Sequence, residues 1–316
     1  MRPPTERELR ALFAELPAPS TVDRWRETAV TGGPKHPPVP ERWLRQRRRA
    51  APAVAAAFAV VIALVAAVVT GRLLYSEQQM AMDADGGAAR LAPPARDEVG
   101  VPSRATLVEH TGDLTITTPG TVLSDLLVTG ALVVAAPDVT LRRVRVLGNV
   151  SDTVRQTDAA PRLTIEDCDL STRVAETADL VATAAVVQEA PGLTVRRCRL
   201  DGPGNGIVVR SDNATVTENY FAKRGVLIES NVSTVVVRGN TMLAVGMDDL
   251  DGPITGVTVE QNTLYRVDAP GWSGSHHIRV LRNTFLGFAP VVGWQDGPPG
   301  NQWRDNVDDR GAPVRP

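Results

Sequence analysis

The chain concentrates acidic side chains in one short run, Asp248-Asp249-Leu250-Asp251-Gly252, whose composition predicts a loop. Clustered carboxylates are the ligands that Ca²⁺ prefers, so Asp248, Asp249 and Asp251 are candidate calcium ligands. Two carboxylates can also act as acid and base in glycoside hydrolysis. Asp248 and Asp249, with His276 further along the chain, are therefore candidate catalytic residues. The alternative is a solvated acidic turn that binds nothing.

A second candidate site combines a basic and an acidic side chain, Arg210 and Glu229, at matching places in two neighbouring repeat units, with Gln188 one unit before. A guanidinium beside a carboxylate could bind a hydroxylated ligand or take part in catalysis. The alternative is a cross-strand ion pair without a ligand. The short turn Lys223-Arg224-Gly225 next to this pair is basic.

Aromatic side chains form the third candidate site. They make up only 4% of the chain, yet Tyr265, Trp272, Trp294 and Trp303 all fall near its end. The faces of aromatic rings stack on sugar rings, so Tyr265, Trp272 and Trp294 could form a carbohydrate platform. The alternative is that the tryptophans cover the open end of the fold, which would otherwise expose unpaired strand edges.

A repeated phrase defines the framework for these side chains. Each copy reads apolar, any, apolar, any, any, then Asn, Cys or Val, any, apolar, and the copies recur about every 21 residues. They begin at Val139, Leu163, Leu193, Ala214, Val235, Val257, Ile278 and, in degenerate form, near Gln302. The alternation predicts strands, and each unit is too short for a strand with a crossover helix. We therefore expect an all-β protein, a parallel β-helix of about eight or nine coils.

Equivalent positions of the phrase should lie above one another, about 4.8 Å apart. The fourth and fifth positions never place like charges on neighbouring coils, which favours this register. The sixth position reads Val144, Cys168, Cys198, Asn219, Asn240, Asn262, Asn283 and Asn306. It predicts an inward asparagine ladder, since Asn tolerates the left-handed backbone of a sharp turn and its amide can bond its stacked copies.

The two cysteines, Cys168 and Cys198, fall in this same column on consecutive coils. Stacking places their Cβ atoms about 4.8 Å apart, against about 3.8 Å in a disulfide. A disulfide and a pair of buried thiols both stay open. Zinc binding through His276 and His277 is disfavoured, because neighbouring strand positions face opposite sides.

The phrase, as in Val257-Thr258-Val259-Glu260-Gln261-Asn262, and its Asn ladder resemble right-handed parallel β-helix proteins of the pectate-lyase-like superfamily over roughly residues 110–310. The stretch 287–306 resembles the last coils of uncharacterised actinobacterial and phage β-helix proteins. The resemblance implies a fold shared by lyases, hydrolases, epimerases and non-catalytic binders. The Asp pair and His276 also resemble polygalacturonase, but Asn240-Thr241-Met242 and Ile278-Arg279-Val280 depart from that family's motifs.

The front of the chain contains an uncharged run, residues 50–71, long enough as a helix to span a bilayer. A buried helix and a cleaved signal peptide are the alternatives to a membrane anchor. Residues 1–49 hold 11 basic and 6 acidic side chains, so the positive-inside rule places them in the cytoplasm and the C-terminal domain outside the cell. Residues 72–104 are expected to form a flexible linker, and 105–316 the extracytoplasmic β-helix.

The remaining expectations concern partners. Thr5 and Glu8 form a capping box before an amphipathic helix, so residues 5–30 could bind a cytoplasmic protein or lie on the membrane. The outer domain holds 19 basic and 25 acidic side chains, which argues against nucleic acid. No cofactor except calcium is expected. We therefore expect a single-pass, membrane-anchored β-helix that binds cell-envelope or environmental polysaccharide without strong catalysis. The alternatives are a polysaccharide lyase or glycoside hydrolase, and a transmembrane coupling protein.

Overall fold

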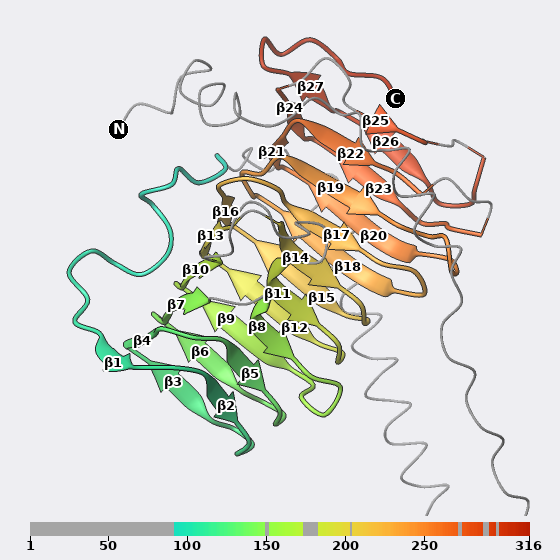
Figure 1. Ribbon diagram of the computed structural model, residues 1–316. Coiled ribbons are helices and arrows are strands. Elements are labelled where there is room, and N and C mark those ends of the chain that lie inside the picture. Colours follow the sequence, from blue (N-terminus) through green and yellow to red (C-terminus); the bar gives the residue numbers. More distant parts are fainter. Residues whose placement is uncertain are drawn as a thin grey trace, which may run out of the picture. The chain divides into compact units, whose positions relative to one another are not determined.

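The computed structural model describes residues 92–148, 152–172, 183–202, 204–270, 274–286, 291–294 and 297–316 (Figure 1). Within these ranges the chain forms 27 strands and no helix. None of the described residues belongs to a helix that could cross a membrane. The anchor predicted at 50–71, the cytoplasmic segment 1–49 and the helix within 5–30 lie outside the described residues.

The strands build three parallel sheets, here called A, B and C. Sheet A contains β1 (Val108–His110), β4 (Leu126–Val128), β7 (Arg145–Gly148), β10 (Asp169–Thr172), β13 (Arg199–Asp201), β16 (Tyr220–Phe221), β21 (Thr263–Leu264), β24 (Thr284–Phe285) and β27 (Val307–Asp308). Sheet B contains β2 (Leu114–Ile116), β5 (Leu132–Val134), β8 (Asp152–Gln156), β11 (Ala184–Gln188), β14 (Asn205–Val209), β17 (Val226–Ile228), β19 (Ala244–Met247), β22 (Arg266–Asp268) and β25 (Val291–Val292). Sheet C contains β3 (Val122–Ser124), β6 (Thr140–Arg142), β9 (Leu163–Glu166), β12 (Leu193–Arg196), β15 (Ala214–Thr217), β18 (Ser233–Arg238), β20 (Thr255–Glu260), β23 (Arg279–Leu281) and β26 (Gln302–Arg304). Single bridges from Thr241 to Tyr220 and Thr263 join the two parts of sheet A.

The chain visits sheets A, B and C in turn, and each strand pairs in parallel with its counterpart on the next coil. The result is a parallel β-helix of about eight turns, which confirms the predicted fold class. Its right-handedness stays a prediction. The repeated phrase is the sheet C strand, and its first positions stack as expected: Leu193 pairs with Ala214, and Ala214 with Val235.

Alternation along the strands sends one face of every coil into a continuous apolar core. The third position of the phrase is fully buried on successive coils, as at Val195, Val216, Val237, Val259 and Val280. A buried valine or leucine of this kind contributes about 1.5–3 kcal/mol relative to an exposed one. Because the core is a column, each coil depends mainly on the coils directly above and below it.

The corner between sheets C and A is built by two consecutive positions of the phrase. The fifth residue has a left-handed backbone, with φ between 50° and 64°, at Asp125, Arg143, Asp167, Arg197, Glu218, Gly239, Gln261, Arg282 and Asp305. The prediction that the asparagines themselves adopt this backbone is therefore wrong. The left-handed residue turns the chain, and the next side chain then points into the corner.

The predicted asparagine ladder occupies this corner and is confirmed. The side-chain oxygen of Asn240 accepts the backbone N–H of Asn219 at 2.8 Å, and Asn262 does the same for Asn240 at 2.9 Å. The amide nitrogen of Asn219 donates to Asn240 at 3.0 Å and to the carbonyl of Val195 at 2.9 Å. Each amide thus satisfies buried backbone groups of its neighbouring coils.

Residues 94–101, here called the N-terminal strap, run along the outer side of sheet A (Figure 1). Thr241 donates its hydroxyl to the carbonyl of Pro94 at 2.9 Å, and the N–H of Gly100 bonds the carbonyl of Arg197 at 2.9 Å. Val99 packs with Tyr220 and Ala222 in a small apolar cluster. The prediction of a flexible linker over 72–104 is therefore wrong for the strap, while residues 72–91 lie outside the described residues.

The last coil closes on an aromatic cap. Trp303 stacks on Phe285 at 5.4 Å between ring centroids and meets Trp294 edge-on at 5.4 Å. Its indole N–H donates to the carbonyl of Val314 at 2.7 Å. Trp294 and Trp303 therefore cover the end of the core, as the alternative to a carbohydrate platform expects.

Candidate functional site

The acidic loop joins β19 to β20 at the corner between sheets B and C. Asp249 is buried, and its carboxylate accepts the hydroxyl of Ser275 at 2.9 Å. The same Ser275 oxygen accepts the N–H of Ile254 at 2.9 Å. Asp249 thus holds the loop to the coil above it, which is a structural role for one of the candidate catalytic residues.

The other side of this loop rests on the turn below. Ser230 donates its hydroxyl to the carbonyl of Asp248 at 2.8 Å and accepts the N–H of Asp251 at 3.0 Å. The Asp248 carboxylate accepts the N–H of Leu250 at 3.3 Å, and Asp251 is exposed. Within the described ranges no three His, Cys, Asp or Glu side chains are grouped to hold a metal ion. The three aspartates share a loop, but the calcium site stays a prediction.

His276 follows Ser275 on the next coil, but it contacts its neighbour in sequence. The Nδ1 atoms of His276 and His277 lie 2.7 Å apart, and the rings meet edge-on at 4.8 Å. The expectation that these rings face opposite sides is wrong, because His277 has a left-handed backbone with φ of 58°. Ser275, rather than His276, supplies the side chain that bonds Asp249.

Arg210 and Glu229 are neighbours on the outer side of the same corner, one coil apart. The Arg210 Nε donates to the Glu229 carboxylate at 2.9 Å, and this bond raises the pKa of Arg210. Glu189 lies 3.9 Å from Arg210 on the coil below and binds Arg155 at 2.7 Å. These four side chains form a continuous ion-pair column, which is the alternative to a ligand site.

The expected place of Gln188 in that column is wrong by one residue. Gln188 pairs with Val209 and is fully buried, so Glu189 is the outward neighbour of Arg210. In β11 the consecutive residues Ala185 and Val186 both face the core, which breaks the alternation. A shift of one residue moves a side chain to the opposite face of a strand.

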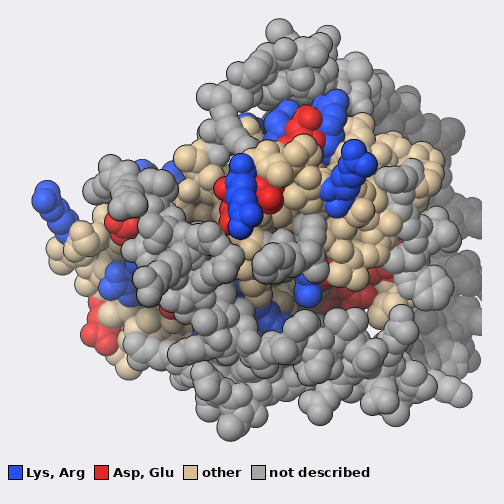
Figure 2. All heavy atoms as spheres, turned by 90° about the horizontal axis from the view of Figure 1, so that it is seen from above, with Lys and Arg blue, Asp and Glu red and all other residues tan. Residues whose placement is uncertain are grey.

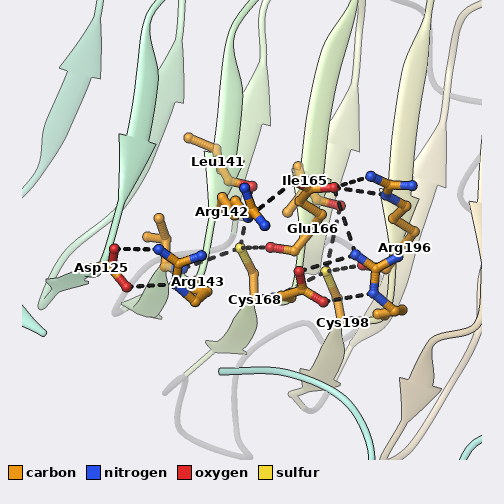
Figure 3. A network of polar contacts seen from close by, with 12 residues as sticks. Asp125, Leu141, Arg142, Arg143, Ile165, Glu166, Cys168, Arg196 and Cys198 are labelled. Carbon is orange, nitrogen blue, oxygen red and sulfur yellow. Dashed lines mark hydrogen bonds and ion pairs between the residues drawn. The ribbon is translucent and has the colours of Figure 1, made fainter. Parts of the chain in front are cut away.

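A second set of ion pairs covers sheet C and its corner with sheet A (Figure 3). Glu166 is nearly buried between arginines of the coils on both sides: Arg142 lies 3.5 Å away, and Arg196 donates from Nε at 2.8 Å. Arg143 binds Asp125 at 2.6 Å, and this bond lowers the pKa of Asp125. The alternating charges predicted for these columns are confirmed. On the face that Figure 2 shows, acidic side chains likewise lie against basic ones.

Cys168 and Cys198 are free thiols at the buried start of the asparagine ladder (Figure 3). The Cys198 sulfur accepts the N–H of Cys168 at 3.4 Å, and it contacts the Arg196 carbonyl at 3.2 Å. Burial is the main cause that raises the pKa of Cys198. A neutral buried thiol is a poor nucleophile, so these residues substitute for asparagine in the fold rather than form a reactive site.

The predicted aromatic platform is divided. Tyr265 is half-buried between β21 and β22, at the corner of sheets A and B. Trp294 follows β25 at a different corner and belongs to the cap, and Trp272 lies outside the described residues. The platform therefore stays a prediction.

One basic cluster, Lys223 and Arg224, was not predicted as a site from the sequence. Lys223 and Arg224 line a small hollow at the corner of sheets A and B, together with Asp201 and Asn205. Burial lowers the pKa of Arg224, and the positive charge of Arg266 lowers it further. A signal was present in the sequence, because Lys223 is one of only two lysines and adjoins an arginine.

Comparison of the chain with protein-family models, with curated proteins and with solved structures found no match. The carboxylates of Asp249 and Glu229 are engaged by Ser275 and Arg210. An acid or base of a hydrolase must instead reach a substrate atom directly or through one water.

Proposed function

We propose that this chain is a membrane-anchored β-helix that binds polysaccharide outside the cell and does not catalyse its cleavage. The regular outer face of sheet C supports the proposal most directly. The second position of the phrase points outward there and is threonine on most coils, half-exposed at Thr140, Thr164, Thr194, Thr215 and Thr258. Their hydroxyls make no hydrogen bond within the described part of the chain.

These hydroxyls repeat with the coil spacing of about 4.8 Å. A linear polymer along the helix axis would therefore meet an equivalent hydroxyl on the four successive coils from Thr140 to Thr215, before Val236 interrupts the column. The neighbouring outward column supplies Arg142, Glu166 and Arg196, whose polar groups can also bond sugar hydroxyls. Threonine also has a high strand propensity, which alone could explain the column. Polymer binding, unlike strand propensity, requires the hydroxyl groups themselves, and this requirement can be tested.

The test uses the full-length chain in detergent and a panel of immobilised neutral and acidic polysaccharides, with and without calcium. Replacing Thr164, Thr194 and Thr215 by valine keeps the shape and strand propensity but removes three hydroxyls. We expect binding to fall at least tenfold, which is about 1.4 kcal/mol. The matched control replaces Thr263 and Thr284 on the outer side of sheet A by valine and should bind like the wild type.

Three results would contradict the proposal. Equal binding by the wild type and the sheet C variant would remove the threonine column from the site. Failure of the wild type to bind any polymer would remove polysaccharide binding altogether. Release of shortened or unsaturated sugars would indicate the lyase or hydrolase alternative, and it would be tested next with Asp248→Asn and Asp249→Asn variants.

A further inference from the structure

The corner between sheets A and B has an unusual charge arrangement at Lys223 and Arg224. On the coils, Arg142, Arg143, Arg196, Arg210 and Arg238, among others, lie within ion-pair distance of an aspartate or glutamate. Lys223 and Arg224 make no ion pair and no hydrogen bond with any described residue. Both are only half-exposed, so water cannot fully replace the missing partners.

A further positive charge, that of Arg266, acts on Arg224. Arg266 lies on β22, two coils further on. Arg266 itself binds Asp268 at 2.8 Å, so that carboxylate already has a partner. Like charges disfavour each other in a half-buried place, and an anion bound at Arg224 would reduce this cost.

The shape of this corner leaves room for a small group. Lys223 and Arg224 line a hollow of about 10 Å³, the space of a single water molecule, with Asn205 and the backbone of Gly204 and Gly206. The glycines are required there, because a Cβ on Gly206 would lie 2.2 Å from the ring of Phe221. The acidic lining residue, Asp201, lies 3.5 Å from Arg96 of the strap, which offsets its charge.

We infer that Lys223 and Arg224 form an oxyanion-binding site, in which one oxygen of a phosphate, sulfate or carboxylate group enters the hollow and the rest of the group stays at the surface. Guanidinium and ammonium groups are the side chains that bind such groups most strongly, arginine through paired N–H donors. The site lies at the corner opposite sheet C, so it is a second site, separate from the threonine column. It also shows how a domain with net acidic charge can bind an anion locally.

The experiment compares the full-length wild type with the double variant Lys223→Gln/Arg224→Gln. The matched control is Arg310→Gln/Arg315→Gln, because these two arginines also make no ion pair within the described residues, and they follow β27 rather than lie on sheet C. Three probes distinguish the source of the anion: inorganic phosphate, dextran sulfate beside uncharged dextran, and phosphatidylglycerol vesicles beside phosphatidylcholine vesicles. The unfolding temperature of each variant checks that the fold is intact.

We expect at least one anionic probe to bind the wild type more weakly as salt is added, and at least tenfold more weakly in the double variant. The control variant should bind like the wild type. The inference is overturned if no anionic probe binds, if the Lys223→Gln/Arg224→Gln variant binds as the wild type does, or if Arg310→Gln/Arg315→Gln loses as much binding. These results leave the neutral polysaccharides of the threonine test unaffected, because binding of an uncharged polymer requires no basic side chain.

Discussion

The backbone N–H of Cys198 donates to the side-chain oxygen of Asn219 at 2.8 Å, whereas the N–H of Cys168 one coil below must use the Cys198 sulfur at 3.4 Å. The two bonds occupy the same place in the ladder. They differ in the acceptor atom, which is oxygen in the first bond and sulfur in the second. Sulfur is the weaker acceptor. The first two rungs are therefore less stable than the asparagine rungs above them.

We predict that Cys198→Asn stabilises the protein by about 1 kcal/mol, the typical contribution of a buried hydrogen bond. The new oxygen would accept the Cys168 N–H. The new amide could donate to the Ile165 carbonyl, which lies 3.6 Å from the present sulfur. Urea unfolding measures the change, and Cys198→Val, which offers no acceptor, is the comparison. A midpoint for the asparagine variant at or below that of the wild type would contradict the prediction.

The asparagine rungs should be sensitive to truncation. Asn240→Ala leaves both the N–H and the side-chain amide of Asn219 without their acceptor, and it also frees the Val216 carbonyl. Each buried unsatisfied group costs about 1–3 kcal/mol, so a loss of about 3 kcal/mol or more is expected in the unfolding free energy. Thr258→Ala on the outer face of sheet C serves as the control and should change it by less than about 0.5 kcal/mol.

The ion pair between Asp138 and Arg162 should make stability depend on pH in one direction. Arg162 donates to both carboxylate oxygens, at 2.6 and 2.7 Å, and this bonding lowers the pKa of Asp138 from its ordinary value of 3.8. A lowered pKa in the folded state contributes stability above the unfolded pKa, and this is lost as the pH falls through the folded value.

Asp138→Asn should therefore lower the urea midpoint near neutral pH by a small amount, since the pair is largely exposed. The difference from the wild type should shrink as the pH falls below 3.8 and vanish once it is below the lowered pKa of Asp138. The control is Asp158→Asn, because Asp158 is exposed and lies in the turn just before Arg162. This variant should leave the midpoint unchanged across the same pH range. A difference for Asp138→Asn that persists in acid would show that the carboxylate charge is not its cause.

Asp169 should hold the N-terminal strap in place. Its carboxylate accepts the N–H of Val101 at 3.2 Å and binds Arg145 and Arg199 at 2.9 Å each. We expect Asp169→Ala to raise amide hydrogen exchange in peptides covering the strap at least tenfold. It should also cost about 1–3 kcal/mol of stability, because the Val101 N–H loses its acceptor while Arg145 and Arg199 stay partly exposed to water. Asp201→Ala removes only the exposed contact with Arg96 and should change exchange little.

The sheet C strands could be predicted in detail because their signals are local and repeated. Every phrase places an apolar residue at the third position and a corner residue at the sixth, so stacking fixes the register from Val139 to Asn306. The strap could not be predicted, because Val99 packs against Tyr220 and Ala222, which lie far along the chain. No repeated motif in the sequence indicates this contact. Its alanines and prolines instead suggested a linker.

The candidate sites were harder to predict for a different physical reason. Arg210 and Glu229 were correctly expected to be neighbours. The residue types alone, however, do not decide whether the two side chains bind a ligand or only each other. Gln188 was misplaced by one residue, because the sheet B strands lack the repeated phrase that sets the register in sheet C, and Gln188 pairs with Val209. Lys223 and Arg224 carried no repeat signal, and their importance depends on Arg266 two coils away, which only the folded chain brings close.

The shared corner makes the length of this protein adjustable. Asn219, Asn240, Asn262 and Asn283 each close a coil in the same way, and each coil bonds only its immediate neighbours. Duplicating or deleting one unit between two such asparagines would restore the asparagine hydrogen bonds at the junction. Genetic gain or loss of single coils can thus change how far the outer faces extend while both ends keep their own closures.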